Sequence, residues 1–533
     1  MKQILQNLGN GETILADVPC PRRGSGSVLT GMPIRMVVRV CIVALTMVMC
    51  STVRSQTVEG YGAVGDGVSD DTAAFERAFA DSQEINLKRN AKYWIQNPIT
   101  VRRDVVINGN GATLVLSSKL RLARSSRISS LNIKGSEAGG SPDRLLELTG
   151  GGTSHFFKQV HFSDQHSESF AQALACVGRV DFDQIVLSQC SFQNITAKAN
   201  GLAGDKLGSV RAIFISVGAK LVMVSGCCFR NINSVDAAGE RFPHDADAIQ
   251  TWNSSGREIE KFVSRGCIFE NVGKRCYKIS NVKLTSISDS VCKSSWDEEV
   301  LGGSVRPGMQ GMVAAYHGKV QIDNCHLSGG ASQGFSFVRS KSLDSVTVTN
   351  CSFIPDSLFL GKIVAELDVG PLNAKWVNAE GHRPIGLSVG AKRAEISGFY
   401  ADNIVSGFTT SSNLPAELFS LKSCHFVTVR NGAVISINAE KLIVDDCLFL
   451  NSKNGNTSQA VQVHNKVKSF TARRNTVVGY RDAFWFQRRN QNHDGDYQFT
   501  VVGNNAIGVA NGFKSQRNSL NQNNYRVVNN SWN

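Results

Sequence analysis

Three side chains able to transfer protons stand close together in the stretch RFPHDADAIQTWN, residues 241–253. They are His244, Asp245 and Asp247. Hydrolysis of a glycosidic bond needs two carboxyl groups, one that donates a proton and one that acts as base or nucleophile. Asp245 and Asp247 are two positions apart, so on a β-strand their side chains face the same way. The stretch is therefore a candidate catalytic site of a glycoside hydrolase.

The sequence around Asp247 aligns with two neighbouring segments of the same pattern. RAIFI (211–215), DAIQT (247–251) and RCYKI (275–279) fall in register if each forms a strand. The alternation then points one residue of each segment inward, namely Ile213, Ile249 and Tyr277. Two outward columns remain, one with Phe214, Gln250 and Lys278 and one with Arg211, Asp247 and Arg275. In the second column a carboxylate lies between two guanidiniums, which is electrostatically favourable.

This arrangement supports two interpretations. In the functional one, the outward face is a carbohydrate groove, the loop 233–244 forms its wall, and Trp252 stacks against a sugar ring. The substrate-binding residues would then be Arg241, Phe214, Gln250, Trp252 and His317. In the structural one, Arg211, Asp247 and Arg275 form a charge ladder that seals a corner, and Gln250 is only solvated.

A lyase that acts by β-elimination is the second chemistry that these residues support. It needs a base for the proton next to a uronate carboxylate, and a cation that neutralises this carboxylate. Lys278 and Arg275 are the candidates for these roles. Calcium is the cofactor expected in that case, but the acidic runs at 445–446, 297–299 and 494–496 match no calcium-loop spacing and are interpreted as solvated turns.

The charge balance restricts the class of partner. The chain has 533 residues and a net charge of +13, with 19% charged residues. Such a balance favours polyanions, among them acidic polysaccharides. Nucleic acid is not expected, because the sequence contains neither a cluster of five Lys or Arg residues nor a zinc-finger or RNA-binding motif.

Residues 32–55 have the pattern of a secretory signal peptide that begins near Met32. Arg35 and Arg39 form its positive region, residues 40–50 its apolar region, and Val53 and Ser55 suit a cleavage site before Gln56. The apolar run is too short to span a bilayer, so stable membrane insertion is not expected. We therefore expect a secreted or periplasmic protein.

A short phrase with a central cysteine recurs through the rest of the chain. Examples are IVLSQCSFQN (185–194), FVSRGCIFEN (262–271), VTVTNCSFIP (346–355) and LIVDDCLFLN (442–451), and the last copies replace Cys with Asn. Each copy consists of a short strand, a polar corner and a second short strand. Repeats of about 20–40 residues built only from short strands indicate a solenoid. In a parallel β-helix the repeated Cys and Asn side chains would stack as internal ladders, with Cys as a small apolar filler.

The segment before the repeats predicts a capping helix. In VEGYGAVGDGVSDDTAAFERAFAD (58–81), Asp70 or Asp71 would cap a helix that starts near Thr72. Phe75, Ala78 and Phe79 would form its apolar face. This segment resembles the opening of the pectate-lyase-like and polygalacturonase-like right-handed β-helix proteins. The resemblance, together with the repeat, covers most of residues 58–533 and implies the fold but not the reaction.

Two further resemblances concern short segments. Asp247 lies where polygalacturonases have the aspartate of an Asn-Thr-Asp-Gly-Ile region, but no Asp-Asp pair follows one coil later, and His317 and Lys278 are the nearest substitutes for the remaining motifs. Residues 1–30 resemble the opening strands of zinc-type medium-chain dehydrogenases and contain no catalytic residues. We interpret 1–31 as a fused fragment or a wrongly assigned start.

The sequence thus predicts an all-β protein, a right-handed single-stranded parallel β-helix of about a dozen coils, with its cap at 56–92 and its coils at 93–533. The expected function is hydrolysis or lysis of an acidic polysaccharide in an outer groove near residues 241–278. The alternative is a non-catalytic glycan-binding or surface-scaffold protein. A second aromatic and charged patch at 484–499 is a candidate binding loop or trimer contact, and the protein is expected to be a monomer or a trimer.

Overall fold

The computed structural model describes most of the chain that follows the predicted signal peptide. The described residues are 56–137, 140–198, 208–235, 246–252, 256–294, 311–330, 333–337, 343–355, 385–404, 406–410, 416–428, 432–436, 439–451, 458–464, 467–487, 498–515 and 525–532. The predicted dehydrogenase-like fragment and signal peptide lie outside them. No helix in these ranges is long and apolar enough to cross a membrane.

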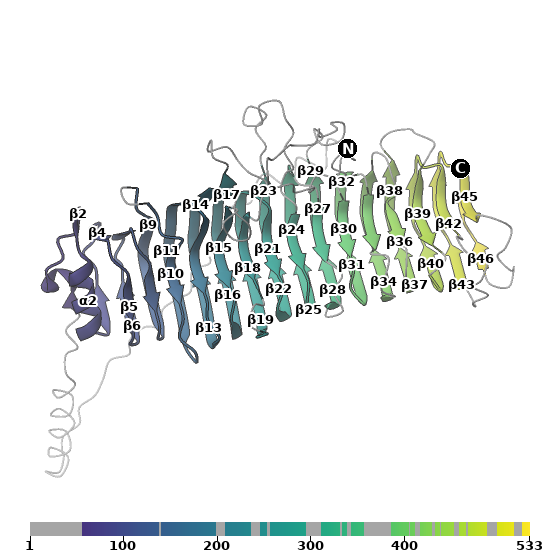
Figure 1. Ribbon diagram of the computed structural model, residues 1–533. Helices are drawn as coiled ribbons and strands as arrows, with labels where there is room; N and C mark the ends of the chain where they lie inside the picture. Colours follow the sequence, from purple (N-terminus) through teal and green to yellow (C-terminus); the bar gives the residue numbers. More distant parts are fainter. Residues whose placement is uncertain are drawn as a thin grey trace, which may run out of the picture. The chain divides into compact units, whose positions relative to one another are not determined.

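Each repeat forms one coil of three strands. In one such coil, β15 (Ser209–Ile215) is followed by β16 (Gly218–Ser225) and β17 (Cys228–Val235). In the next coil, β18 (Ala246–Thr251), β19 (Ile259–Arg265) and β20 (Ile268–Val272) lie parallel to their counterparts. Figure 1 shows the coils stacked side by side from α2 to β45. This pairing confirms the predicted single-stranded parallel β-helix.

One side of the solenoid is a continuous parallel sheet, called here the short-strand sheet. It has 15 strands in the order β5, β8, β10, β12, β15, β18, β21, β24, β27, β30, β33, β36, β39, β42 and β45. Its first and last members are β5 (Ile99–Val101) and β45 (Asn511–Ser515). The solenoid therefore has more coils than the dozen that the sequence predicted. The remaining strands form the two other sides, which are joined by the long bent strands β9 (Ser126–Gly135) and β11 (Ser154–Ser167).

The predicted cysteine ladder is present in the interior. Backbone hydrogen bonds link the successive ladder positions: Cys228 N donates to Cys190 O at 3.0 Å, and Ile268 N donates to Cys227 O at 2.9 Å. Cys227, rather than Cys228, therefore occupies the ladder position. Each ladder thiol contacts the carbonyl two residues earlier, as in Cys351 Sγ to Thr349 O at 3.1 Å. The eleven described cysteines are all free.

Asparagine continues this ladder toward the C-terminal end, as the repeat predicted. Asn475 Nδ2 donates to Asn504 Oδ1 at 2.8 Å, and Asn504 Nδ2 donates to Asn530 Oδ1 at 2.8 Å. Asn475 Oδ1 also accepts the backbone N–H of Cys447 at 2.9 Å. An amide provides both a donor and an acceptor, so it can link to the coil on either side.

The N-terminal cap is the helix α2 (Thr72–Asp81), which lies at the end of the stack beside β5 (Figure 1). Phe75, Ala78 and Phe79 are buried, as the apolar spacing predicted. Asp71 is the N-cap residue but its side chain forms no capping hydrogen bond, while Asp70 accepts the backbone N–H of Thr72 at 3.0 Å. The carboxylate of Asp71 turns back instead and accepts the N–H of Val64 at 2.6 Å, which fixes the glycine-rich loop against the helix.

Candidate functional site

The predicted register around Asp247 is confirmed on the short-strand sheet. Arg211 pairs with Asp247, and Asp247 pairs with Arg275 of β21 (Arg275–Ile279). Phe214, Gln250 and Lys278 form the neighbouring column, while Ile213, Ile249 and Tyr277 lie in the core. The strand alternation in the sequence was therefore sufficient to align three coils.

Asp247 is fully buried and bound by a guanidinium. Arg275 Nε donates to Asp247 Oδ1 at 2.6 Å and Arg275 Nη2 donates to Oδ2 at 3.1 Å, while Lys278 Nζ lies 3.9 Å from Oδ2. A two-point contact of this kind is among the stronger polar interactions in proteins. The Asp247–Arg275 part of the charge ladder in the structural interpretation is therefore present.

The second column is more enclosed than the sequence indicated. Gln250 is 2% exposed and Lys278 is 8% exposed, so the expectation that Gln250 is merely solvated is wrong. The Gln250 amide oxygen accepts a hydrogen bond from Arg211 Nε, and the same guanidinium lies over the ring of Phe214 at 5.2 Å. These contacts hold the column together as a packed polar layer.

Trp252 behaves as predicted, because it is 44% exposed directly after β18. Lys278 Nζ lies 5.4 Å from the centre of its ring, in a cation–π arrangement that holds the indole in place. An exposed, fixed indole is a suitable surface for stacking against a sugar ring. His244, Asp245 and Arg241 lie outside the described residues, so their roles stay predictions.

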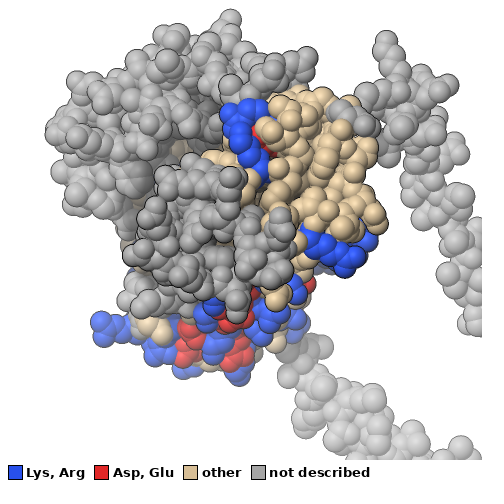
Figure 2. Space-filling model, turned by 90° about the vertical axis from the view of Figure 1, so that its right-hand side faces the viewer, with Lys and Arg blue, Asp and Glu red and all other residues tan. Residues whose placement is uncertain are grey.

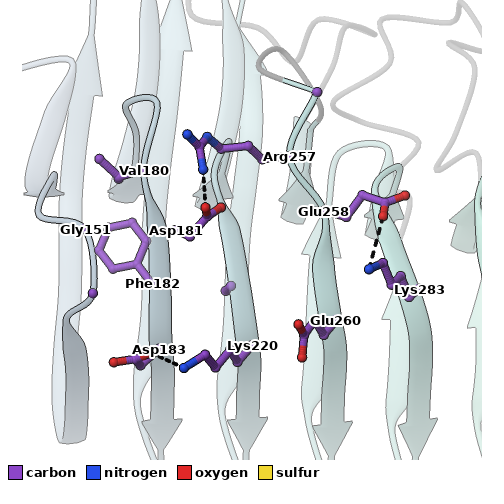
Figure 3. A pocket seen from close by; sticks show the side chains of 13 residues that line it. Gly151, Val180, Asp181, Phe182, Asp183, Lys220, Arg257, Glu258, Glu260 and Lys283 are labelled. Atoms are coloured by element: carbon purple, nitrogen blue, oxygen red, sulfur yellow. Dashed lines mark hydrogen bonds and ion pairs between the residues drawn. The ribbon is translucent and has the colours of Figure 1, made fainter.

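An open groove lies on the same coils, at the corner where the short-strand sheet passes into the next side of the solenoid. Its volume is about 710 Å³. Five successive segments line it: the loop before β11, the starts of β13 (Asp181–Ser188), β16 and β19 with the residues just before them, and β22 (Val282–Ser288). Four strand spacings make this groove about 19 Å long. Figure 3 shows its charged side chains.

Two pairs of carboxylates point into this groove. Asp181 and Asp183 flank the buried Phe182, and Glu258 and Glu260 flank the buried Ile259. Because side chains alternate along a strand, burial of the central residue turns both acidic neighbours outward. The same alternation that builds the core therefore places four carboxylates on the groove wall.

One strand, β16, separates the two pairs. Asp181 pairs in register with Gly218, and Ala219 pairs with both Phe182 and Ile259, so Lys220 lies between Asp183 and Glu260. Two strand spacings put each Asp about 10 Å from the corresponding Glu at the backbone. Gly218 has no side chain, and the Asp181 carboxylate occupies the place that a Cβ would take there.

Three of the four carboxylates are ion-paired. Asp183 Oδ1 lies 2.7 Å from Lys220 Nζ, and Arg257 pairs with Asp181. Glu258 contacts Lys283 Nζ at 3.5 Å and His317 Nε2 at 2.9 Å. The predicted site residue His317 therefore contacts Glu258 but does not itself line the groove, and its role in substrate binding stays a prediction.

The sequence analysis missed Asp181, Asp183, Glu258 and Glu260, although a signal was present. The stretches VDFDQI (180–185) and EIEKF (258–262) both alternate acidic with apolar residues at the start of a repeat copy. The two stretches lie near one another because their strands, β13 and β19, both pair with β16 of the coil between them. The repeat spacing alone, without the strand pairing, does not show this.

Within the described ranges no three His, Cys, Asp or Glu side chains converge as a metal site. Asp445 pairs instead with Arg473 at 3.2 Å and Arg474 at 2.8 Å. The acidic runs at 297–299 and 494–496 lie outside the described residues. Calcium therefore stays a prediction that is tied to the lyase chemistry.

No family model and no curated protein matches this sequence. Among solved structures, the tailspike protein of E. coli bacteriophage HK620, in complex with a pentasaccharide, is 10% identical with a TM-score of 0.37, over 85% of this chain and 78% of the tailspike. The catalytic unit of a GH87 α-1,3-glucanase from Streptomyces thermodiastaticus is 12% identical with a TM-score of 0.30, over 90% of this chain and 69% of the glucanase. At such low identity and TM-score, these likenesses say nothing of the activity of this chain.

Proposed function

We propose that this protein hydrolyses a polysaccharide in the groove lined by Asp181, Asp183, Glu258 and Glu260. The observation that carries the proposal is the placement of two acidic pairs on opposite sides of β16, about 10 Å apart at the backbone. Inverting glycoside hydrolases hold their two carboxyl groups roughly 6.5–9.5 Å apart, which leaves room for the attacking water. Rotation of the Asp181 and Glu258 side chains can bring their carboxyl groups to a separation within that range.

Asp181 and Glu258 are the better catalytic pair. The strand position between them is Gly218, which has no side chain and over which the Asp181 carboxylate lies, whereas Lys220 fills the corresponding space between Asp183 and Glu260. His317 Nε2 lies 2.9 Å from Glu258 Oε1, so an imidazole that can give or take a proton is in contact with the Glu258 carboxylate. In this proposal Glu258 transfers the proton to the leaving oxygen, and Asp181 activates the water.

The groove favours a neutral rather than an acidic glycan. Its lining contains four carboxylates and the three cations Lys220, Arg257 and Lys283. The carboxylates outnumber the cations by one, so the lining offers an acidic chain no excess of positive charge. On the face shown in Figure 2, basic and acidic side chains lie together along the lower edge. The expectation of an acidic substrate rests on net charge alone.

A non-catalytic glycan-binding protein is the second candidate. It is favoured by the ion pairs that already engage Asp181, Asp183 and Glu258. The lyase chemistry has less support, because Arg275 is bound to the buried Asp247 and Lys278 is largely enclosed. In both cases we propose that the chain is exported after cleavage before Gln56, which N-terminal sequencing of the exported protein tests.

Glycan digestion with matched variants tests the proposal. The chain from Gln56 is incubated with neutral and acidic polysaccharides, and both reducing ends and the ultraviolet absorbance of unsaturated uronates are followed. We expect reducing ends without new absorbance, and a loss of at least about 100-fold in Asp181→Asn and in Glu258→Gln. Asp344→Asn is the matched control, because Asp344 is a surface carboxylate paired with Lys392 at 2.9 Å outside the groove.

Three results would contradict the proposed hydrolase. New absorbance indicates a lyase instead. Equal loss in the Asp344→Asn control indicates a general effect on the fold. Binding of a glycan without any turnover indicates the non-catalytic protein.

A further inference from the structure

A second hollow lies on the outer surface at the far end of β13 from Asp181. Its volume is about 490 Å³, and it is lined by Gly111, Ser130, Asn132, Gln159, His161 and Gln189. Gln189 directly follows Ser188, the last residue of β13. Seven residue steps along that strand put the hollow roughly 23 Å from the acidic groove. The two places are therefore separate.

The lining of this hollow forms hydrogen bonds but carries no charge. Three amides, a hydroxyl and an imidazole provide donors and acceptors, and none of the lining residues is Asp, Glu, Lys or Arg. His161 Nδ1 is hydrogen-bonded to Ser191 Oγ at 2.8 Å, and burial lowers the pKa of His161, so its ring is neutral at pH 7. Uncharged amides and hydroxyls match the donor and acceptor pattern of sugar hydroxyl groups.

Both glutamines of this hollow occupy the left-handed corner of their coil. Gln159 and Gln189 have φ values of 55° and 54°, in the left-handed region that favours Gly, Asn and Asp. The same corner of the next two coils carries Gly226 and Gly266. Other coils also have a left-handed residue with a side chain at this corner, among them Asn350, Ser423 and Asn529, so the conformation belongs to the coil itself.

The side chains of both glutamines have unused hydrogen-bonding capacity. Ser130 Oγ lies 3.5 Å from Gln159 Oε1, at the limit of a hydrogen bond. Among the described residues the Gln159 amide nitrogen and the Gln189 amide have no further partner. A Cβ added at Gly226 would lie 3.8 Å from Gln189 Cγ, so the missing side chain keeps the hollow open beside Gln189.

We propose that this hollow is a binding subsite for an uncharged sugar residue, with Gln159, Gln189 and His161 as its hydrogen-bonding groups. The subsite goes beyond the proposed hydrolase, because it does not require turnover in the acidic groove. It would hold a neutral polysaccharide to the surface of the solenoid, away from the place of cleavage.

The test compares glycine variants at one structural position. Gln159→Gly/Gln189→Gly removes both amides and inserts the residue best suited to a left-handed corner, so the fold is retained. Ser423→Gly/Asn529→Gly is the matched control, because these residues occupy the same corner in distant coils, with φ values of 50° and 52°. All variants are made in an Asp181→Asn/Glu258→Gln background, so that no ligand is consumed.

Binding is measured by calorimetry with neutral hexasaccharides of glucose, mannose and xylose, and with hexagalacturonate as the charged probe. We expect a neutral hexasaccharide to bind about tenfold more weakly to the glutamine variant than to the parent, and equally well to the control and the parent. Unchanged affinity in the glutamine variant, or binding of the charged probe alone, would overturn the subsite. Turnover by the native chain together with unchanged affinity would reject the subsite and leave the hydrolase in place.

Discussion

Arg275 holds the carboxylate of Asp247 with two hydrogen bonds, of 2.6 Å and 3.1 Å, at a position where Asp247 has no solvent exposure. Removing one partner of a buried ion pair leaves the other charge without compensation. This relationship makes Asp247 a structural residue in our interpretation.

Asp247→Asn should therefore destabilise the fold. It keeps the size of the side chain and removes its charge, so the buried Arg275 loses the carboxylate that accepts its two hydrogen bonds. We expect a loss of about 3–5 kcal/mol in the free energy of unfolding, measured by chemical denaturation. Asp344→Asn, in the exposed pair with Lys392, should change it little. Unchanged stability together with lost turnover would restore Asp247 to the catalytic site.

His155 should make stability depend on pH. It is fully buried between Ser126 Oγ at 2.8 Å and Thr153 Oγ1 at 3.0 Å, and burial lowers its pKa from 6.5 to about 4. Between these values the unfolded chain binds a proton that the folded protein does not, so stability is present above pH 6.5 and falls as the pH drops toward 4.

The loss over this range should be about 3 kcal/mol, because one pKa unit corresponds to about 1.4 kcal/mol. Unfolding of the parent and of His155→Gln is compared at pH 7 and pH 4.5. The variant should show less of this decline, while the surface variant His425→Gln should decline as the parent does. An equal decline in His155→Gln would show that other groups cause it.

The cysteines of the ladder should not react with thiol reagents in the folded protein. Ten of the eleven described cysteines are buried and only Cys228 is partly exposed, and a hydrogen bond with the neighbouring ladder thiol, together with burial, raises the pKa of Cys351 and Cys447. Reactivity requires an accessible thiolate. A thiol-reactive dye should therefore label about one cysteine per folded chain starting at Gln56, eleven after denaturation, and none in folded Cys228→Ser. Rapid labelling of several thiols in the folded protein would contradict a closed interior.

The asparagine ladder should be sensitive to loss of its amides. Asn475→Ala leaves the N–H of Cys447 without its acceptor and removes one of the two hydrogen bonds to Asn504 Oδ1, which should cost about 2–4 kcal/mol in the free energy of unfolding. Asn475→Cys extends the thiol ladder by one coil and should cost less. If Asn475→Cys cost more than Asn475→Ala, the hydrogen bonds of the asparagine side chain would contribute little, and side-chain volume would decide the stability.

Much of the architecture could be predicted from the sequence because it depends on patterns among residues that are close in the chain. The alternation of apolar and polar residues fixed the strands, and repetition of Cys or Asn at one corner fixed how the coils stack. The spacing of Phe75, Ala78 and Phe79 fixed the capping helix. The alignment of Asp247 between Arg211 and Arg275 is a further case, since it required only that three similar strands lie in register.

Only the tertiary structure decided which polar side chains meet and which face solvent. Asp183 and Glu260 are 77 positions apart, and they approach one another because one coil is interposed between their strands, with Lys220 between them. Likewise Gln250 and Lys278 point outward as the alternation requires, yet they are covered. Strand periodicity sets the direction of a side chain, whereas burial and ion pairing depend on what the rest of the chain places beside it.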